Sequence, residues 1–148
     1  MKGFLRIGDT TFELNDSALY SKALFYLDDE DIDHYIMAIN ALFKLGLYGD
    51  EEVYPEISIY VGKTDFNDVS SMVGMVIEMN DTHISRKKGD VADILGCEAF
   101  DKYKTKILEI ENGEMHIEVS GQIIKDIDDW PRETEEFYMD VWLTIEYL

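Results

Sequence analysis

Two stretches of the sequence place carboxylates and a histidine at spacings that could bind a metal ion. In the first, Asp29-x-Asp31-x-Asp33 imitates the opening of a calcium-binding loop. Such a loop also needs glycine at its sixth position and glutamate at its twelfth, where this sequence has His34 and Asn40. Asp31 and His34 could share one face of a helix, as in di-metal bundles, but the sequence has no second copy of the pair. We therefore interpret these acids as residues that begin a helix.

The second stretch is ILEIENGEMHIEV, residues 107–119, which carries four glutamates and no lysine. Asn112-Gly113 in its middle predicts a β-hairpin with a type I′ turn, because both residues accept a positive φ. The turn would set four opposed pairs: Glu111 with Glu114, Ile110 with Met115, Glu109 with His116, and Leu108 with Ile117. A carboxylate opposite an imidazole could hold a divalent cation. Side chains on a regular sheet face run parallel and do not converge on an ion, so we predict no metal but leave this alternative open.

Side-chain alternation sorts this hairpin into two faces. The apolar face would consist of Leu108, Ile110, Met115, Ile117 and Val119. The acidic face would consist of Glu109, Glu111, Glu114, His116 and Glu118. Ile107 is the exception, because the same register places it on the acidic face opposite Glu118.

The segment before these strands predicts the principal helix, at about residues 29–45. Its apolar residues recur at helical spacing: Ile32, Ile36, Ile39, Leu42 and Phe43. Gly46 follows, at the left-handed position that ends many helices. A second, short helix is expected over 90–95, with Asp90 as its N-cap.

The other patterned segments predict strands, at 4–14 (a hairpin turning at Gly8-Asp9), 56–61, 72–79, 84–87 and 137–147. The last strand alternates, with Phe137, Met139, Val141, Leu143, Ile145 and Tyr147 on its apolar face. Trp142 falls on the other face, so it is either covered by another group or exposed to a partner. The fold class is therefore α+β: a mainly antiparallel sheet of about six to eight strands with the helix packed on it.

Composition limits the function classes. The chain has 148 residues, which fits a single domain over 1–148. Its net charge of −19 argues against direct binding to nucleic acid or to an anionic membrane, since both need cationic contacts. Cys97 is the single cysteine, which favours a reducing compartment, and no apolar run is long enough to span a bilayer. We expect a cytoplasmic protein without a cofactor.

The charge is segregated along the chain. Residues 28–81 carry a net charge of −11 and residues 109–148 carry −10, whereas residues 86–106 carry +2. Because Asp126 to Trp130 (DIDDW) lies just before the last strand, we expect its acids to gather near one end of the hairpin's sheet. The predicted partner-binding residues are Glu109, Glu111, Glu114, His116, Glu118, Asp126, Asp128, Asp129, Trp130 and Tyr138. The carboxylates would accept hydrogen bonds from arginine or lysine, and the aromatic side chains would supply buried contact area.

In overall character the chain resembles the immunity proteins of bacterial polymorphic-toxin systems, which are short, acidic and cytoplasmic. The resemblance implies an inhibitory complex with a basic toxin domain, often a nuclease. No catalytic residue is predicted, because the sequence has no nucleophile elbow, Walker loop, dinucleotide fingerprint or zincin motif. Three alternatives stay open: a DNA mimic that blocks a nucleic-acid-binding protein, a small-ligand or enzymatic α+β module, and a structural subunit that self-associates. A further interpretation is that the acidic residues serve only to keep the protein soluble or to protect a sheet edge from aggregation.

Overall fold

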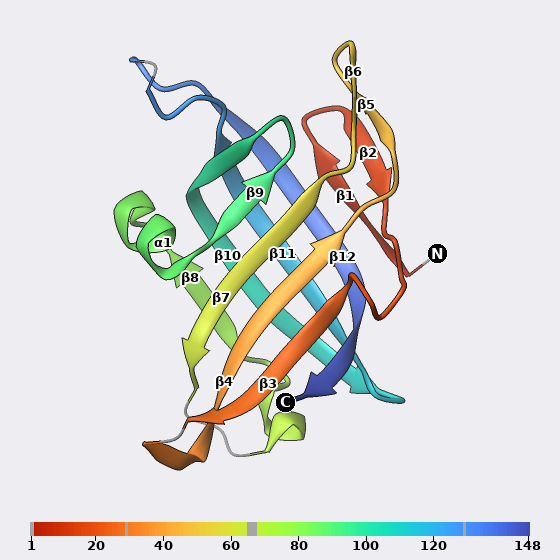
Figure 1. Ribbon diagram of the computed structural model, residues 1–148, viewed down its shortest axis with the longest axis vertical. Coiled ribbons are helices and arrows are strands. Elements are labelled where there is room, and N and C mark those ends of the chain that lie inside the picture. The colour runs from red at the N-terminus through yellow and green to blue at the C-terminus, as the bar shows by residue number, and fades with distance from the viewer. Residues whose placement is uncertain (1, 29, 65–67, 129) are drawn as a thin grey trace.

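The computed structural model describes residues 2–28, 30–64, 68–128 and 130–148, and most of them lie in strands (Figure 1). The strands are β1 (Gly3–Ile7), β2 (Thr10–Glu13), β3 (Lys22–Asp28), β4 (Asp31–Leu42), β5 (Gly46–Tyr48), β6 (Glu51–Val53), β7 (Glu56–Lys63), β8 (Val76–Met79), β9 (Val91–Asp93), β10 (Cys97–Glu111), β11 (Glu114–Ile124) and β12 (Thr134–Tyr147). The helical elements are a 3-10 turn, η1 (Val69–Met72), and a short α-helix, α1 (Thr82–Lys88).

Seven of these strands close into a barrel. Their order is β3, β4, β7, β9, β10, β11 and β12, and β12 completes the ring by pairing with both β11 and β3. The β12–β3 pairing is parallel, whereas the other pairings of the described strands are antiparallel. The β1–β2 hairpin extends from β12, β8 pairs with β10, and β5 and β6 form a separate two-stranded sheet. The mainly antiparallel sheet is thus confirmed, but it is closed.

The predicted principal helix at 29–45 is wrong, because this segment forms β4, a strand that pairs with β3 on one side and β7 on the other. Residue 29 lies outside the described residues. The buried positions alternate along the chain: Met37, Ile39, Ala41 and Phe43. Ile36, Ala38 and Leu42 add apolar residues at intervening positions, so the segment matches both the helical period and the strand period. Pairing with β3 and β7 on either side favours the strand over the helix. The acids at 31 and 33 therefore lie in a strand and do not begin a helix.

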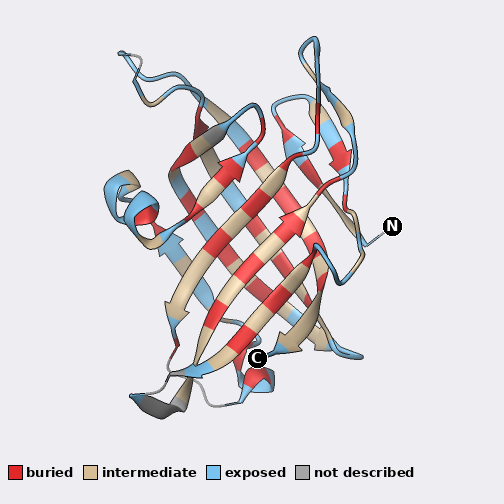
Figure 2. Cartoon of the chain, viewed as in Figure 1, coloured by how far each residue is buried: buried red, intermediate tan, exposed pale blue. Residues whose placement is uncertain are grey.

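The interior of the barrel is filled by one side of each strand, as the alternating buried and half-buried bands in Figure 2 show. On β12 the predicted apolar face is confirmed for its first four members, Phe137, Met139, Val141 and Leu143, all of which are buried. Facing strands contribute Phe25, Ile59 and Ile117, among others, to the same core. Each strand therefore presents its alternate side chains to solvent, and these are the side chains available for function.

The helix α1 occupies 82–88, where the sequence predicted a strand at 84–87. The Asp81 side chain accepts hydrogen bonds from two backbone N–H groups of its first turn, and Gly89 ends it with φ 102°. The short helix expected at 90–95 is likewise wrong, because β9 lies there. None of the helices in the described part of the chain has the length and apolar character needed to cross a membrane.

Asp90 is buried at the foot of α1 and organises a polar network. Its carboxylate accepts hydrogen bonds from the Ser85 hydroxyl at 2.7 Å, the Tyr103 hydroxyl at 2.7 Å and the Tyr60 backbone N–H at 2.8 Å. The Lys88 ammonium lies 3.3 Å from the carboxylate and donates to the Tyr60 carbonyl at 2.9 Å. Burial and donation to Asp90 raise the pKa of Tyr103. The side chains of Asp90 and Lys88 thus bond the backbone N–H and carbonyl of Tyr60, which lies on β7 just beyond the residues that pair with β9.

Asp90→Ala should lower the free energy of unfolding by about 3–5 kcal/mol, because it leaves the Lys88 ammonium unpaired and three donors without their acceptor. Urea denaturation at pH 7 measures the change. Asp93→Ala, at an exposed position on β9, is the control and should stay within about 0.5 kcal/mol. A loss below about 1 kcal/mol for Asp90→Ala would show that the network contributes little.

Candidate partner-binding surface

The acidic hairpin forms as the Asn112-Gly113 turn predicted, with both turn residues at positive φ. The pairs Glu111–Glu114, Ile110–Met115 and Glu109–His116 are confirmed. The register then shifts, so that Ile117 pairs with Ile107 and Leu108 lies in the irregularity. The predicted pairing of Leu108 with Ile117 is therefore wrong, and so is the placement of Ile107 among the acids: Ile107 is buried at 1% exposure. A bulge turns this isoleucine into the core.

The outward side chains of the hairpin meet those of β12, because β11 pairs with β12 along its whole length. We call this surface the acidic face. It consists of Glu109, Glu111, Glu114, His116 and Glu118 from the hairpin with Tyr138, Asp140 and Trp142 from β12. Asp140 and Trp142 were not among the predicted site residues, although the alternation of the last strand places both of them beside Tyr138.

His116 lies at the centre of the acidic face. It is opposite Trp142 in the register, and the two rings stack with centroids 4.7 Å apart and planes 13° from parallel. Its Nε2 lies 2.7 Å from an Asp140 carboxylate oxygen, and its Nδ1 lies 3.7 Å from the Glu109 carboxylate. The histidine therefore covers Trp142, which is half-buried, and holds it in one orientation. This settles how the tryptophan is accommodated on a polar face.

Tyr138 joins two carboxylates that would otherwise repel each other. Glu118 and Asp140 are opposite in the β11–β12 register. The Tyr138 hydroxyl donates to Glu118 at 2.7 Å and lies 3.5 Å from Asp140. Burial, followed by hydrogen bonding to Glu118 and the charges of both acids, raises the pKa of Tyr138 to about 12. The phenol thus stays protonated and able to donate throughout the neutral range.

Basic groups compensate part of the acidic face. The Lys2 ammonium contacts Glu114 at 2.6 Å, and Lys106 lies opposite Glu118 in the β10–β11 register. The acids near the hairpin tip are more accessible, since the Glu109 side chain is 62% exposed and Glu111 is exposed. The most accessible carboxylates of the surface are therefore those near the tip.

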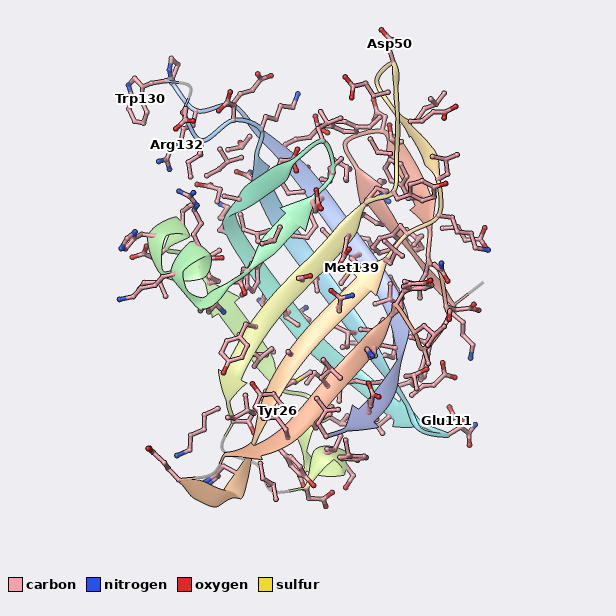
Figure 3. All side chains as sticks on the ribbon, viewed as in Figure 1. Tyr26, Asp50, Glu111, Trp130, Arg132 and Met139 are labelled. Atoms are coloured by element: carbon pink, nitrogen blue, oxygen red, sulfur yellow. The ribbon has the colours of Figure 1, made fainter. Side chains whose placement is uncertain are left out.

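The DIDDW loop does not join this surface. Figure 3 shows Trp130 at one end of the barrel and Glu111 at the other. Asp126 accepts a hydrogen bond from the Asp128 backbone N–H at 2.9 Å, which forms a local turn, and Trp130 is 86% exposed. Asp129 lies outside the described residues. The predicted partner-binding residues therefore do not form one surface, because β11 carries the chain from the hairpin tip at one end of the barrel to this loop at the other.

The metal alternative at Glu109 and His116 gains no support from the geometry. Within the described ranges, the histidine, cysteine, aspartate and glutamate side chains form no group of three that could hold a metal ion. The nearest arrangement is the His116 ring between Asp140 and Glu109, and its closer contact is a 2.7 Å hydrogen bond. Asp140 therefore orients the His116 ring through this hydrogen bond, whereas Glu109 lies 3.7 Å from the other ring nitrogen, beyond hydrogen-bond distance.

Glu118→Gln should lower the pKa of Tyr138 from about 12 toward its ordinary value near 10, because it removes the charge that disfavours the phenolate. Carbon-13 NMR of labelled tyrosine follows this titration, and Tyr138→Phe assigns the signal. Since the folded state has the raised pKa, the free energy of unfolding should fall as the pH rises from about 10 through about 12. Tyr138→Phe should reduce that fall. A pKa unchanged by Glu118→Gln would contradict the proposed coupling.

Comparisons with known proteins do not assign a relative. Searches against protein-family models, curated proteins and solved structures found no match to this chain. A function is therefore inferred from the charges and contacts of the described residues.

Proposed function

We propose that the chain is a binding protein whose acidic face holds a basic protein partner. The position of β11 in the closed sheet carries this proposal. β11 bears Glu114, His116 and Glu118, and it is paired on both sides, with β10 and β12. Protection of an open sheet edge does not account for acids on such a strand. Within the face, Tyr138 and Lys106 already offset the repulsion between Glu118 and Asp140, so the carboxylates left for a partner are those near the hairpin tip.

The arrangement suggests how a partner would be held. Glu109 and Glu111 would accept charge-assisted hydrogen bonds from arginine or lysine at the accessible tip. Trp142, beneath the His116 ring, offers apolar contact area beside them. Because stacking already restricts both rings, little side-chain entropy remains to be lost on binding. The net charge of −19 would speed the encounter with a cationic surface.

An immunity protein is the biological role that best fits such a surface. The partner would then be a toxin domain with a basic surface, such as a nuclease, and the complex would keep the toxin inactive in the cytoplasm. A DNA mimic would use the same carboxylates and would exclude DNA from one shared site on its target. Simultaneous binding of DNA and this protein by the partner would favour the immunity role.

The variant Glu109→Lys with Glu111→Lys should bind the partner at least about a hundredfold more weakly, because two attractive contacts become repulsive. The tagged wild type first captures the partner from host extract, and the purified partner is then titrated calorimetrically at two salt concentrations. Binding should weaken as salt increases.

A control variant, Asp50→Lys with Glu52→Lys, makes the same change in net charge. Both of these acids are exposed on the β5–β6 hairpin, and Asp50 lies far from Glu111 (Figure 3). The control should bind within about threefold of the wild type. Equal weakening by the two variants, or a partner with an acidic binding surface, would contradict a specific role for the acidic face.

A further inference from the structure

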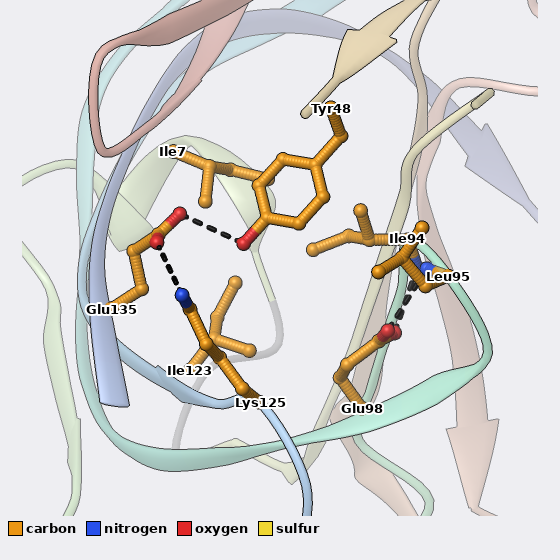
Figure 4. A pocket seen from close by; sticks show the side chains of 8 residues that line it. All are labelled: Ile7, Tyr48, Ile94, Leu95, Glu98, Ile123, Lys125 and Glu135. Atoms are coloured by element: carbon orange, nitrogen blue, oxygen red, sulfur yellow. Dashed lines mark hydrogen bonds and ion pairs between the residues drawn. The ribbon is translucent and has the colours of Figure 1, made fainter. Parts of the chain in front are cut away.

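A pocket lies at the end of the barrel where β11 leaves and β12 begins (Figure 4). Its volume is about 160 Å³. Ile7, Ile94 and Ile123 are buried and supply apolar walls, with the half-exposed Leu95 at the rim. Tyr48 reaches across from the β5–β6 sheet. A cavity of about 150 Å³ lined by such side chains accepts a molecule the size of benzene.

Glu135 is the polar centre of this pocket. One oxygen of its carboxylate accepts from the Tyr48 hydroxyl at 2.9 Å, and the other lies 3.2 Å from the Lys125 ammonium. Burial, followed by hydrogen bonding to Glu135, raises the pKa of Tyr48 to about 12. The same carboxylate raises the pKa of Lys125. Each carboxylate oxygen has two lone pairs, so Glu135 can accept a further donor.

Glu98, the second carboxylate of the pocket, has a different role. It accepts backbone N–H groups from Ile94 at 2.9 Å, Leu95 at 2.9 Å and Gly96 at 3.2 Å. These bonds shape the loop between β9 and β10 and thereby fix the apolar rim. The Glu98 carboxylate is thus engaged by backbone N–H groups of this loop, and Glu135 is the pocket carboxylate that can accept a hydrogen bond from a ligand.

The charges around the pocket favour a cation. The pocket opens beside a wider hollow that shares Tyr48, Lys125 and Glu135 and adds three acids, Asp9, Asp50 and Glu51. Lys125 is the single basic residue among those lining the two hollows in the described part of the chain. An anion of the same size would face these carboxylates, whereas an ammonium would be attracted by them.

We infer that this pocket binds a small organic amine, with its ammonium on Glu135 and an apolar group of about one ring among the isoleucines. Lys125 already shows the interaction, since its own ammonium contacts Glu135 from the pocket wall. A ligand amine would share or replace that contact. The site is separate from the acidic face, so a partner bound there and an amine bound here can be tested independently.

Benzylamine is the probe, and its binding is followed by ¹H–¹⁵N NMR titration of the full chain. It should bind saturably with a Kd of about 1 mM, as its few heavy atoms allow, and shift the signals of Ile94, Leu95 and Ile123. Methylamine carries the charge without the ring, and benzoate carries the ring with the opposite charge. Both should bind at least about tenfold more weakly. Equal binding of benzoate, or shifts from methylamine as large as those from benzylamine, would overturn the inference.

Two variants with opposite expected effects make the test specific. Glu135→Gln should weaken benzylamine binding about tenfold or more, because it removes the charge that holds the ammonium. Lys125→Met keeps most of the alkyl wall but removes the competing ammonium, so it should tighten binding about threefold or more. Glu52→Gln removes an exposed carboxylate that does not line the pocket and should change nothing. Retained NMR dispersion establishes that each variant folds. Unchanged binding by Glu135→Gln, or weaker binding by Lys125→Met, would overturn the inference.

Discussion

The parallel pairing of β12 with β3 joins the two ends of the sheet, and the rest of the architecture depends on it. Thr144 to Tyr147 lie beside Lys22 to Phe25, so the last strand of the chain meets its third. Once the sheet is closed, one side of each strand faces an enclosed core and the other faces water. Phe25, Ile117 and Val141 are fully buried inside this ring. The helix predicted at 29–45 does not cover the sheet, because residues 31–42 form β4, one of its strands.

The Asp90 network bonds backbone groups of the barrel strand β7 that have no partner in β9. β9 pairs with only the first part of β7, at Glu56 to Ser58, while β7 continues to Lys63. At Tyr60 the Asp90 carboxylate accepts the backbone N–H and the Lys88 ammonium donates to the carbonyl. Two side chains thus replace a strand neighbour, and their mutual charge makes the replacement stronger than neutral groups would. This network anchors α1 against the barrel wall.

The same closed geometry separates the two polar features of functional interest. The acidic face lies on the outside of β10, β11 and β12, and its accessible acids are near the turn of the hairpin. The amine pocket opens at the other end of β11, around Glu135. Each feature places carboxylates beside aromatic or aliphatic surface, an arrangement suited to cationic groups that also carry apolar atoms. A large cationic surface would fit the first, and a single small amine would fit the second.

Where a structure is specified by neighbouring residues, the sequence was sufficient. Asn112-Gly113 accepts positive φ locally, and the pairing of Glu109 with His116 follows from it. The inward face of β12 follows from alternation in the same way. The prediction of the principal helix was wrong because the apolar residues of 31–42 fit both the helical and the strand period. Pairing with β3 and β7 favoured the strand, and the sequence of this segment does not reveal that pairing.

The sites depended on contacts between distant segments. The contact of His116 with Asp140 requires β11 and β12 to be paired, and the pocket combines segments from β1, β5, β11 and β12 with the loop between β9 and β10. The separation of Trp130 from the hairpin tip likewise follows from the direction of β11. The sequence by itself determined the charge, the turn and the alternating faces, because these depend on single residues and local dihedral angles. Only the tertiary structure decided which strands are neighbours, because closure of the sheet is a property of the whole chain.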